Sequence, residues 1–489
     1  MTEQPSGSAE ACTLVIFGSR GDLSQRKLWP ALYNLDVDGA LPAHFNILGI
    51  GRHAVTVDQF RAEVRNDITT FSRRPLDPAV WQRFQARISY FVGDAEAPAM
   101  FPPLKQYLEQ LGRECGTSGN VVYYFAVPPS VTPPLLDHLH TSGLLPRQTR
   151  QPWVRVVLEK PFGRDMASAH ALNEQLREML DEAQVYRIDH YLAKETVQNI
   201  LVFRFANLLF EPVWNSRYID SVQITMAEKI GIGDRGAFYE EAGVVRDVVQ
   251  NHLLQLLALV AMEPPVKMDA ESFRDEVEKV LRAVQSAQAA DAVRGQYVGY
   301  RAEPSVAPDS VTPTYAALRL AVDNWRWHGV PFYLRAGKRL ATQVTEIDIR
   351  FRGVPHCLFD DDEVCARLDP NVLSLRIQPE EQINLTFLAK PPGNRLDVQQ
   401  EDMNFCYHCK YGTTPTEAYE RLILNVFQGD PTLFVRSDAV ETQWRIVEPL
   451  LQDWDAHPPT DFPNYAPGSW GPPAAETLLE REGKTWWVK

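Results

Sequence analysis

The sequence predicts a two-domain protein: an α/β domain with a doubly wound parallel sheet, then an α+β domain with a large, mainly antiparallel sheet and helices. The chain has 489 residues, more than one hydrophobic core usually organises. Its first third alternates short apolar strands with helical segments, as in parallel sheets. After about residue 186, long helices and strands of alternating polarity are typical of an antiparallel sheet. We therefore expect domains at residues 1–186 and 187–489.

The strands of the first domain are near-continuous apolar runs, because both faces of a parallel sheet are covered. They are expected at 13–18, 45–52, 88–94, 120–130 and 153–163. Helices are expected between them, at about 22–35, 101–113, 133–140 and 165–183.

The second domain combines long helices with strands in which polar and apolar residues alternate. The helices are expected at 194–209, 241–262 and 271–289. The strands are expected at 221–228, 345–351, 372–379 and 382–390. The proline-rich segment after Leu451 is expected to wrap irregularly over the surface.

The charge and hydropathy of the chain indicate which kinds of partner it can bind. The chain carries 49 Lys and Arg against 63 Asp and Glu, a net charge of −14, which argues against nucleic acid or a membrane surface. No apolar run approaches the roughly 18–20 residues that span a bilayer, and the N-terminal residues lack the features of a targeting segment. We expect a cytoplasmic protein that binds anionic small molecules through local clusters of cations.

The cysteines predict no metal site. The six residues are irregularly spaced, which suits free thiols in a reducing compartment: Cys12, Cys115, Cys357, Cys365, Cys406 and Cys409. Cys406 and Cys409, with His408 between them, have the C-x-x-C spacing of a zinc half-site. We expect this segment to be a strand, where positions i and i+3 point to opposite faces.

The first motif is GSRGDLSQRK, which begins at Gly18 after an apolar strand. Glycines at this turn let backbone amides approach a pyrophosphate at a helix N-terminus, as in Rossmann-like domains. The candidate coenzyme-binding residues of the turn are Gly18, Ser19, Arg20, Gly21, Asp22 and Leu23. A tight βα turn without any ligand would also use glycine.

The end of the second strand indicates which dinucleotide is bound. An acidic residue there accepts bonds from the ribose of NAD, whereas a basic residue suits the 2′-phosphate of NADP. Arg52 is basic, His53 follows it, and Arg20 could supply a second cation. These features favour NADP. An exposed arginine at a strand end is the alternative reading of Arg52.

A strand that ends in Glu-Lys-Pro supplies another candidate cation. Lys160 follows the apolar run 156–158, and the carboxyl edge of a parallel sheet is the usual ligand crevice. Pro161 is a candidate for a cis peptide that holds the turn. Taken alone, Lys160 could equally be a surface lysine.

The stretch RIDHYLAKE at 187–195 contains six ionisable side chains. If a helix begins near residue 190, His190, Tyr191 and Lys194 lie on one side of its first turns. Together with the helix dipole they would bind a phosphate group. Asp189 would only repel that phosphate, so it requires another role. The alternative is the solvated face of a helix.

His252 lies in a predicted helix whose second half is almost entirely apolar. Asp247 and Asn251 lie close to it in sequence, and buried polar groups of this kind must find partners. A carboxylate such as Asp189 could fix the tautomer of a histidine base. A lone histidine in an apolar helix is otherwise a satisfied core residue.

The motifs together resemble the glucose-6-phosphate dehydrogenase family over nearly the whole chain. RIDHYL-x-KE followed by RDVxQNHLLQ is highly specific to that family. The segments occur in order: the GxxGDL turn, EKPFG, RIDHYLAKE, RFAN (204–207), VVRDVVQNHLLQ, PFYLRAGKRL (331–340) and AYERLILNVF (418–427).

The resemblance implies oxidation of D-glucose 6-phosphate at C1 to 6-phospho-D-glucono-1,5-lactone with hydride transfer to NADP, the first step of the oxidative pentose phosphate pathway. It also implies a homodimer or homotetramer that forms through the C-terminal sheet. By motif, His252 is the general base and Asp189 orients it. His190, Tyr191 and Lys194 match the phosphate clamp. The remaining matches are Glu228, Asp247 and Lys338 at the sugar, Lys160 between coenzyme and substrate, and Lys27 near the same junction.

Three departures from the family pattern stand out. Ala193 replaces a usual glycine and favours a helix. Arg20 replaces a small residue in the glycine turn, which could strengthen 2′-phosphate binding or change coenzyme choice. Gln343 occupies about the position of a basic residue that assists substrate binding, so substrate affinity could be lower.

Two other functions fit parts of the sequence. One is an oxidoreductase of a neighbouring class that acts on a non-phosphorylated sugar, against which the intact phosphate clamp argues. The other is a catalytically silent paralogue, which would have no reason to keep Asp189 and His252.

Overall fold

The computed structural model describes residues 9–147, 150–359, 361–394, 396–406, 409–410, 412 and 416–487. These form two compact units, and neither unit is continuous in sequence. The first contains the described residues up to Ala193, with Lys267–Arg274 and Thr416–Val440; the second contains Lys194–Val266, the described parts of Asp275–Pro415, and the residues from Glu441 onward. The predicted division between residues 186 and 187 stays a prediction.

The first unit is built on a seven-stranded sheet in the order β15-β6-β5-β4-β1-β2-β3. All neighbours pair in parallel except β15, which is antiparallel to β6. The strands are β1 (Cys12–Phe17), β2 (Phe45–Gly51), β3 (Ile88–Val92), β4 (Val121–Phe125), β5 (Val154–Leu158), β6 (Val185–Ile188) and β15 (Phe434–Val435). The five predicted strands are present, whereas β6 and β15 were not predicted.

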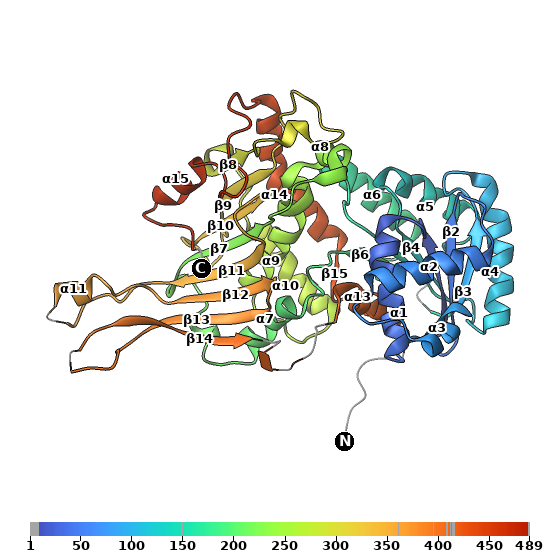
Figure 1. Cartoon of the computed structure of the whole chain (residues 1–489), viewed down its shortest axis with the longest axis horizontal. Coiled ribbons are helices and arrows are strands. Elements are labelled where there is room, and N and C mark those ends of the chain that lie inside the picture. Colours follow the sequence, from blue (N-terminus) through green and yellow to red (C-terminus); the bar gives the residue numbers. More distant parts are fainter. Residues whose placement is uncertain are drawn as a thin grey trace, which may run out of the picture. The chain divides into compact units, whose positions relative to one another are not determined.

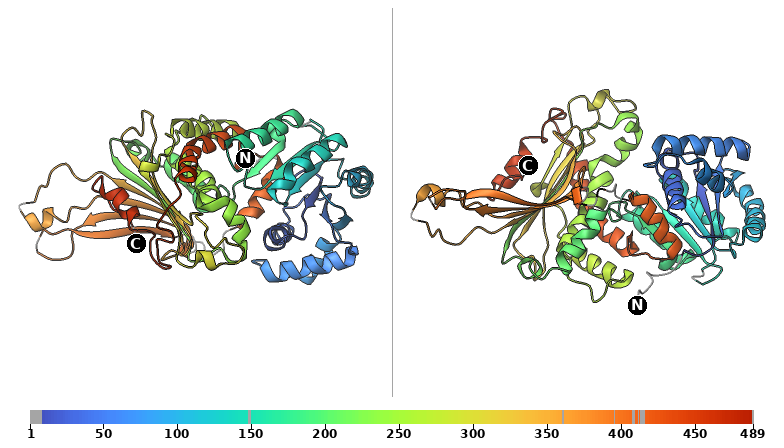
Figure 2. Two further views of the ribbon diagram at one scale, coloured as in Figure 1. Left: turned by 90° about the horizontal axis from the view of Figure 1, so that it is seen from above. Right: turned by 60° about the horizontal axis from the view of Figure 1, so that its bottom comes forward.

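Helices of this unit lie on both faces of its sheet (Figures 1 and 2). They are η1 (Ser24–Leu28), α1 (Trp29–Val37), α2 (Val57–Phe71), α3 (Pro78–Gln85), α4 (Phe101–Cys115), α5 (Thr132–Thr141), α6 (Met166–Met179) and α13 (Ala418–Gln428), with short turns η2 (Pro98–Met100), η3 (Pro129–Val131) and η4 (Glu182–Gln184). Local sequence fixes several ends. Thr56 begins α2 with a capping box, and Gly116 ends α4 in the left-handed conformation.

A segment from late in the chain completes the first unit. Glu420 of α13 accepts hydrogen bonds from Asn34 and, in a two-pronged ion pair, from Arg73. The ring of Phe427 lies 5.0 Å from that of Phe45. Such pairings join residues hundreds of positions apart, which is why the sequence did not assign α13 to this unit.

The second unit contains an eight-stranded sheet in the order β14-β13-β12-β11-β7-β10-β9-β8. β7 and β10 pair in parallel, and the other pairings between described strands are antiparallel. The strands are β7 (Ile219–Ala227), β8 (Ala292–Gly295), β9 (Tyr315–Ala321), β10 (Pro331–Gly337), β11 (Val344–Phe351), β12 (Val372–Gln378), β13 (Gln382–Ala389) and β14 (Gln399–Cys406). The predicted fold class is confirmed.

Helices and a long C-terminal segment accompany this sheet. The helices are α7 (Glu195–Phe205), η5 (Glu211–Val213), η6 (Gly233–Arg235), α8 (Gly236–Val244), η7 (Val245–Leu253), α9 (Leu254–Ala261), α10 (Ala270–Ala283), η8 (Ala289–Asp291), η9 (Tyr300–Ala302), α11 (Asp362–Cys365), α14 (Ser437–Ala456) and α15 (Ala474–Glu480). The C-terminal segment with α15 lies on the sheet face opposite α9 (Figures 1 and 2). Trp486 and Leu479 are buried there against Tyr315 and Tyr333.

One helical stretch, Gly233–Ala261, is long and apolar enough to cross a membrane by length and composition alone. In the protein, 94% of its most apolar window is buried, as in the core helix of a soluble protein. This stretch carries η7, in which His252 lies.

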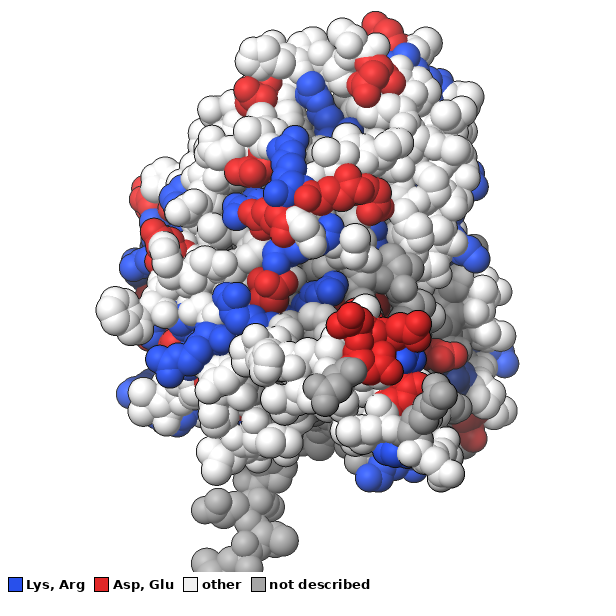
Figure 3. Space-filling model, turned by 90° about the vertical axis from the view of Figure 1, so that its left-hand side faces the viewer, with Lys and Arg blue, Asp and Glu red and all other residues white. Residues whose placement is uncertain are grey.

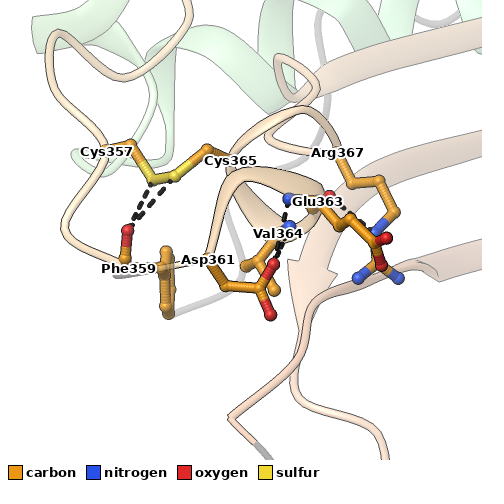
Figure 4. The surroundings of a disulfide bond; sticks show 7 residues. All are labelled: Cys357, Phe359, Asp361, Glu363, Val364, Cys365 and Arg367. Carbon is orange, nitrogen blue, oxygen red and sulfur yellow. Dashed lines mark hydrogen bonds between the residues drawn. A yellow bond between two sulfur atoms is a disulfide. The ribbon is translucent and has the colours of Figure 1, made fainter.

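Four cysteines form disulfides, so the expectation of free thiols is wrong for them. Cys357 is bonded to Cys365, and Cys406 to Cys409. Figure 4 shows the first bond closing the loop before α11, where Asp361 caps the helix by accepting bonds from the amides of Glu363 and Val364.

The second disulfide forms because β14 ends at Cys406, so Cys409 does not follow the strand geometry assumed for it. His408 lies outside the described residues. Cys406 is opposite Gln382 in the sheet, whereas the loop closed by Cys357 and Cys365 joins the other ends of β11 and β12. The two cysteine pairs therefore lie at opposite ends of the strands.

Charged side chains of both signs lie close together on the face shown in Figure 3. Within the second unit, basic side chains also pair with acidic ones. Arg376 pairs with Glu346 across β12 and β11, and Lys484 pairs with Asp220. These basic residues are neutralised locally instead of forming one basic field.

Candidate active site

The glycine turn lies at the carboxyl end of β1, next to β2 and β4. Gly18 has φ +81°, and a Cβ there would lie 2.1 Å from the carbonyl oxygen of Ala126, so only glycine fits. The amide of Gly21 and the hydroxyl of Ser24 both donate to the Gly18 carbonyl. The turn then enters η1, a π-helical segment, a geometry found frequently at functional sites.

The cavity beside this turn is the candidate site for a dinucleotide. It has a volume of about 420 Å³ and is lined by Gly18, Arg20, Gly21, Arg52 and His53, among other residues. Ser19 is buried, with its hydroxyl bonded to the carbonyl of Ile50. The glycine backbone can therefore come close to a pyrophosphate, and Arg52 is exposed at the end of β2, where a 2′-phosphate would be read.

Other residues of the turn have structural partners. The exposed Asp22 pairs with Arg26 one helical turn later, and Leu23 directly precedes η1. Lys27 lies 3.3 Å from a carboxylate oxygen of Glu417, at the start of α13. The contact with Glu417 is not predictable from sequence pattern, because 390 residues separate the two.

The turn after β5 places Lys160 at the same edge of the sheet. The Lys160–Pro161 peptide is cis, as predicted. Beside it, Glu159 accepts a 2.5 Å hydrogen bond from the hydroxyl of Tyr124. Desolvation by burial raises the pKa of Glu159 to about 7 from 4.5, against the opposing effect of its tyrosine hydrogen bonds.

This shift predicts a pH-dependent loss of stability. Between pH 4.5 and 7 the folded chain retains a proton on Glu159 that the unfolded chain has released, so stability falls as pH rises. We expect Glu159→Gln to remove a loss on the order of 2 kcal/mol across this window. Urea unfolding at several pH values measures it, with Glu109→Gln on the exposed face of α4 as control. The same pH slope in wild type and Glu159→Gln would contradict the prediction.

The RIDHYLAKE stretch is a strand end and a turn before a helix. β6 ends at Ile188, α7 begins at Glu195, and Lys194 is its N-cap residue. The helical spacing expected for His190, Tyr191 and Lys194 is therefore wrong. The physical reason is that Asp189 accepts a bond from the amide of Tyr191, an Asx turn that competes with helix formation.

Aromatic residues fix this turn in the first unit. The ring of His190 lies 4.9 Å from that of Tyr191 and is stacked at 6.3 Å on that of Tyr419. Asp189 and Tyr191 are buried. The guanidinium of Arg421 donates to the carbonyl of Ala193. Tyr419 belongs to the AYERLILNVF segment, and the sequence predicts no role for it.

The second unit brings Glu228, Asp247 and Lys338 together. The ammonium of Lys338 pairs with Glu228 and lies 3.9 Å from Asp247. Glu228 directly follows β7 and Lys338 directly follows β10. Because this pair of strands is parallel, with Ala227 opposite Gly337, both side chains leave the same edge of the sheet.

Tyr239 belongs to the same cluster and was missed from the sequence. The Lys338 ammonium lies 5.7 Å from the centre of its ring, within cation–π range. Among the described residues, no hydrogen-bond partner faces its buried hydroxyl. Burial, and then the charge of Asp247, raises the pKa of Tyr239 well above its ordinary value.

His252 and Asp247 lie on η7, a π-helical segment that follows a break at Gly243. His252 is 2% exposed. The neighbouring Asn251 is satisfied by main-chain groups, since its amide donates to the carbonyl of Arg246 and its oxygen accepts from the amide of His252. The expected set of buried polar groups is therefore present on this helix.

Gln343 contacts the residue that follows Glu228. Its side-chain oxygen accepts a 3.2 Å bond from the amide of Lys229. It also lines a separate cavity together with Arg335 and Trp470. Its predicted role in substrate binding stays a prediction.

Family models match both parts of the chain. Residues 15–199 match the NAD-binding domain of glucose-6-phosphate dehydrogenase, and residues 201–487 match its C-terminal domain. The chain belongs to the glucose-6-phosphate dehydrogenase family. The family predicted from the sequence is thus confirmed, and with it an oxidoreductase that uses NADP.

Full-length relatives agree with this membership. The chain is 44% identical to glucose-6-phosphate 1-dehydrogenase of Chlamydia pneumoniae, over 97% of this chain and 96% of the relative. It is 39% identical to that of Bacillus subtilis, over 97% and 98%.

Solved structures of the family have the same fold. A glucose-6-phosphate dehydrogenase in complex with its substrate glucose-6-phosphate has a TM-score of 0.90 at 34% identity, covering 99% of this chain and 100% of that one. The enzyme from Mycobacterium avium has a TM-score of 0.83 at 38% identity, with the same coverage.

Proposed function

We propose that the chain oxidises the C1 hydroxyl of D-glucose 6-phosphate to 6-phospho-D-glucono-1,5-lactone, with NADP as the hydride acceptor. The observation that carries this proposal is the cluster of Lys338, Glu228 and Asp247 at the edge of a parallel strand pair. In a chain of this family, it supplies a cation and two carboxylates for the hydroxyls of a sugar. NADP, when bound, accepts the hydride that leaves C1.

His252 is the base of this reaction. Loss of hydride from C1 is easier when the hydroxyl proton is removed, and a neutral imidazole is suited to that removal near pH 7. Asp189 keeps the role that its motif assigns to it, that of the carboxylate orienting the base. His190, Tyr191 and Lys194 bind the phosphate, and energy from this remote group helps to position C1.

The glycine turn, Lys27 and Lys160 serve the coenzyme side of the reaction. Gly18 and Gly21 admit the pyrophosphate, and Arg52 binds the 2′-phosphate of NADP. Lys160, at the carboxyl edge of the first sheet, serves both coenzyme and substrate.

Initial rates of NADPH formation by the purified protein test the proposal. We expect activity with glucose 6-phosphate and far less with glucose, because glucose lacks the phosphate. Comparable rates on both sugars would favour the alternative oxidoreductase that acts on non-phosphorylated sugars. No NADPH from glucose 6-phosphate would reject the proposal.

We expect Arg52 to determine the preference for NADP over NAD. Arg52→Gln should raise KM for NADP by about tenfold or more, because a charge-assisted bond to phosphate is lost, while KM for NAD changes little. Parallel titrations with both coenzymes measure this, with Arg113→Gln on α4 as control. Equal losses for NADP and NAD would mean that Arg52 does not read the 2′-phosphate.

The same proposal includes self-association in the cytoplasm, as a homodimer or homotetramer through the sheet of the second unit. β14 supports it: this strand is at the edge of the sheet, and six of its eight residues are exposed, which leaves backbone groups available for pairing. Light scattering gives the mass, and a monomer at micromolar concentration would reject this part.

A further inference from the structure

We propose that Glu63 of α2 is a specificity-determining residue that occupies the guanidinium of Arg20 and so weakens the preference for NADP over NAD. This rests on the proposed use of NADP. Arg20 Nε and Nη2 donate to the two carboxylate oxygens of Glu63 at 2.8 and 2.9 Å. This two-pronged geometry is the one by which arginine also binds phosphate. The groups of Arg20 best suited to a 2′-phosphate are therefore engaged by a carboxylate.

The pair lies beside the predicted site of the 2′-phosphate. Arg20 and His53 line the dinucleotide cavity, and both also line a second cavity of about 660 Å³ that contains Glu63 and Asp67. The chain around His53 is held in place, since its carbonyl accepts a 2.8 Å bond from the hydroxyl of Tyr90. A coenzyme that reaches Arg52 and His53 thus comes next to the Arg20–Glu63 pair.

The second cavity is acidic as well as basic. Asp67 lies one helical turn after Glu63 on α2. Burial, and then repulsion by Glu63, raises the pKa of Asp67 to about 6. Two neighbouring carboxylates disfavour a bound dianionic phosphate, whereas a ribose hydroxyl can donate a hydrogen bond to either of them. The acidic groups therefore oppose NADP and tolerate NAD.

The carboxylate of Glu63 can give way to a ligand phosphate at Arg20. Side-chain exposure is 30% for Arg20 and 40% for Glu63, and ion pairs that are open to water contribute little to stability. A 2′-phosphate can replace the Glu63 carboxylate at Arg20, or share the guanidinium with it, at a small energetic cost. NADP bears this cost, and NAD, which has no 2′-phosphate, does not.

The test measures binding of two nucleotide fragments, adenosine 2′,5′-bisphosphate and AMP, by isothermal titration calorimetry. We expect Glu63→Gln to bind the bisphosphate about fivefold more tightly, the upper effect of an exposed ion pair, with AMP unchanged within about twofold. Asp58→Asn is the matched control, since it removes a charge from an exposed position on the same helix, and it should change neither affinity.

A second variant shows that the effect passes through Arg20. In an Arg20→Gln background, Glu63→Gln should strengthen bisphosphate binding much less than it does in the wild type. Unchanged or weaker binding of the bisphosphate to Glu63→Gln would overturn the proposal. Failure of the wild type to bind either nucleotide would instead overturn the coenzyme site on which the proposal rests.

Discussion

Replacement of His252 by asparagine is expected to lower kcat by about 10²–10⁴-fold, the usual contribution of a general base. Asparagine retains polarity and much of the volume, but its amide cannot accept the proton of the C1 hydroxyl. His252 is 2% exposed on η7, so no solvent base can readily replace it. KM for glucose 6-phosphate should change by less than about fivefold, because the base acts mainly in the transition state.

Steady-state kinetics at saturating NADP, together with calorimetric binding of glucose 6-phosphate, measure this split. His140→Asn is the control, since His140 is an exposed histidine of α5, and it should retain wild-type kinetics. Near-normal turnover of His252→Asn would remove the residue from the role of base. Loss of binding together with turnover would instead assign His252 to the binding of substrate.

The sequence predicted many of the strands and several of the helices, because the burial of an element determines where its apolar residues occur, but it did not predict α2 or the 20-residue α14. The apolar runs of the first sheet and the alternating strands of the second agree with β1 to β5 and with β7, β11, β12 and β13 within a few residues. β8, β9, β10 and β14 were not predicted by residue range, and neither were β6 and β15 of the first sheet. β6 and β15 are four and two residues long, so neither has enough length to show a period.

The sequence predicts candidate site residues where one motif carries them, but it does not show contacts between distant segments. Gly18, Arg52 and the cis peptide before Pro161 belong to local turn chemistry. The pairing of Arg20 with Glu63 joins residues 43 positions apart, and that of Lys27 with Glu417 spans 390. No periodicity encodes such pairs.

The sequence pattern also did not predict the π-helical geometry of the two segments that carry motifs. η1 and η7 have π-helical hydrogen bonds, which shift side chains away from the 3.6-residue period used to assign faces. The predicted helix 194–209 starts within one residue of α7, whereas a helix start near residue 190 is wrong for a related reason. The side chain of Asp189 provides a local hydrogen bond that favours a turn, and composition alone does not show whether the turn or the helix prevails.

Lys338→Met is expected to affect both stability and substrate binding. The Lys338 side chain is 7% exposed, as is that of Asp247, and it also pairs with Glu228. Removal of the ammonium leaves two carboxylates close together with no cation between them. Breaking a buried pair typically costs about 3–5 kcal/mol, and because Glu228 is partly exposed we expect a loss of about 3 kcal/mol in the free energy of unfolding. KM for glucose 6-phosphate should rise at least about tenfold, since a charged hydrogen-bond donor is lost.

A second substitution separates the two roles of Lys338. In Lys338→Met, Glu228→Gln, one of the two repelling charges is gone, so urea unfolding should recover more than half of the lost stability. KM should stay high, because neither substitution restores a cation or a carboxylate for the sugar hydroxyls. If KM instead recovers together with stability, the ion pair only supports the fold and the sugar is bound elsewhere. The site assignment for the second unit therefore depends on stability and KM responding differently in the double variant.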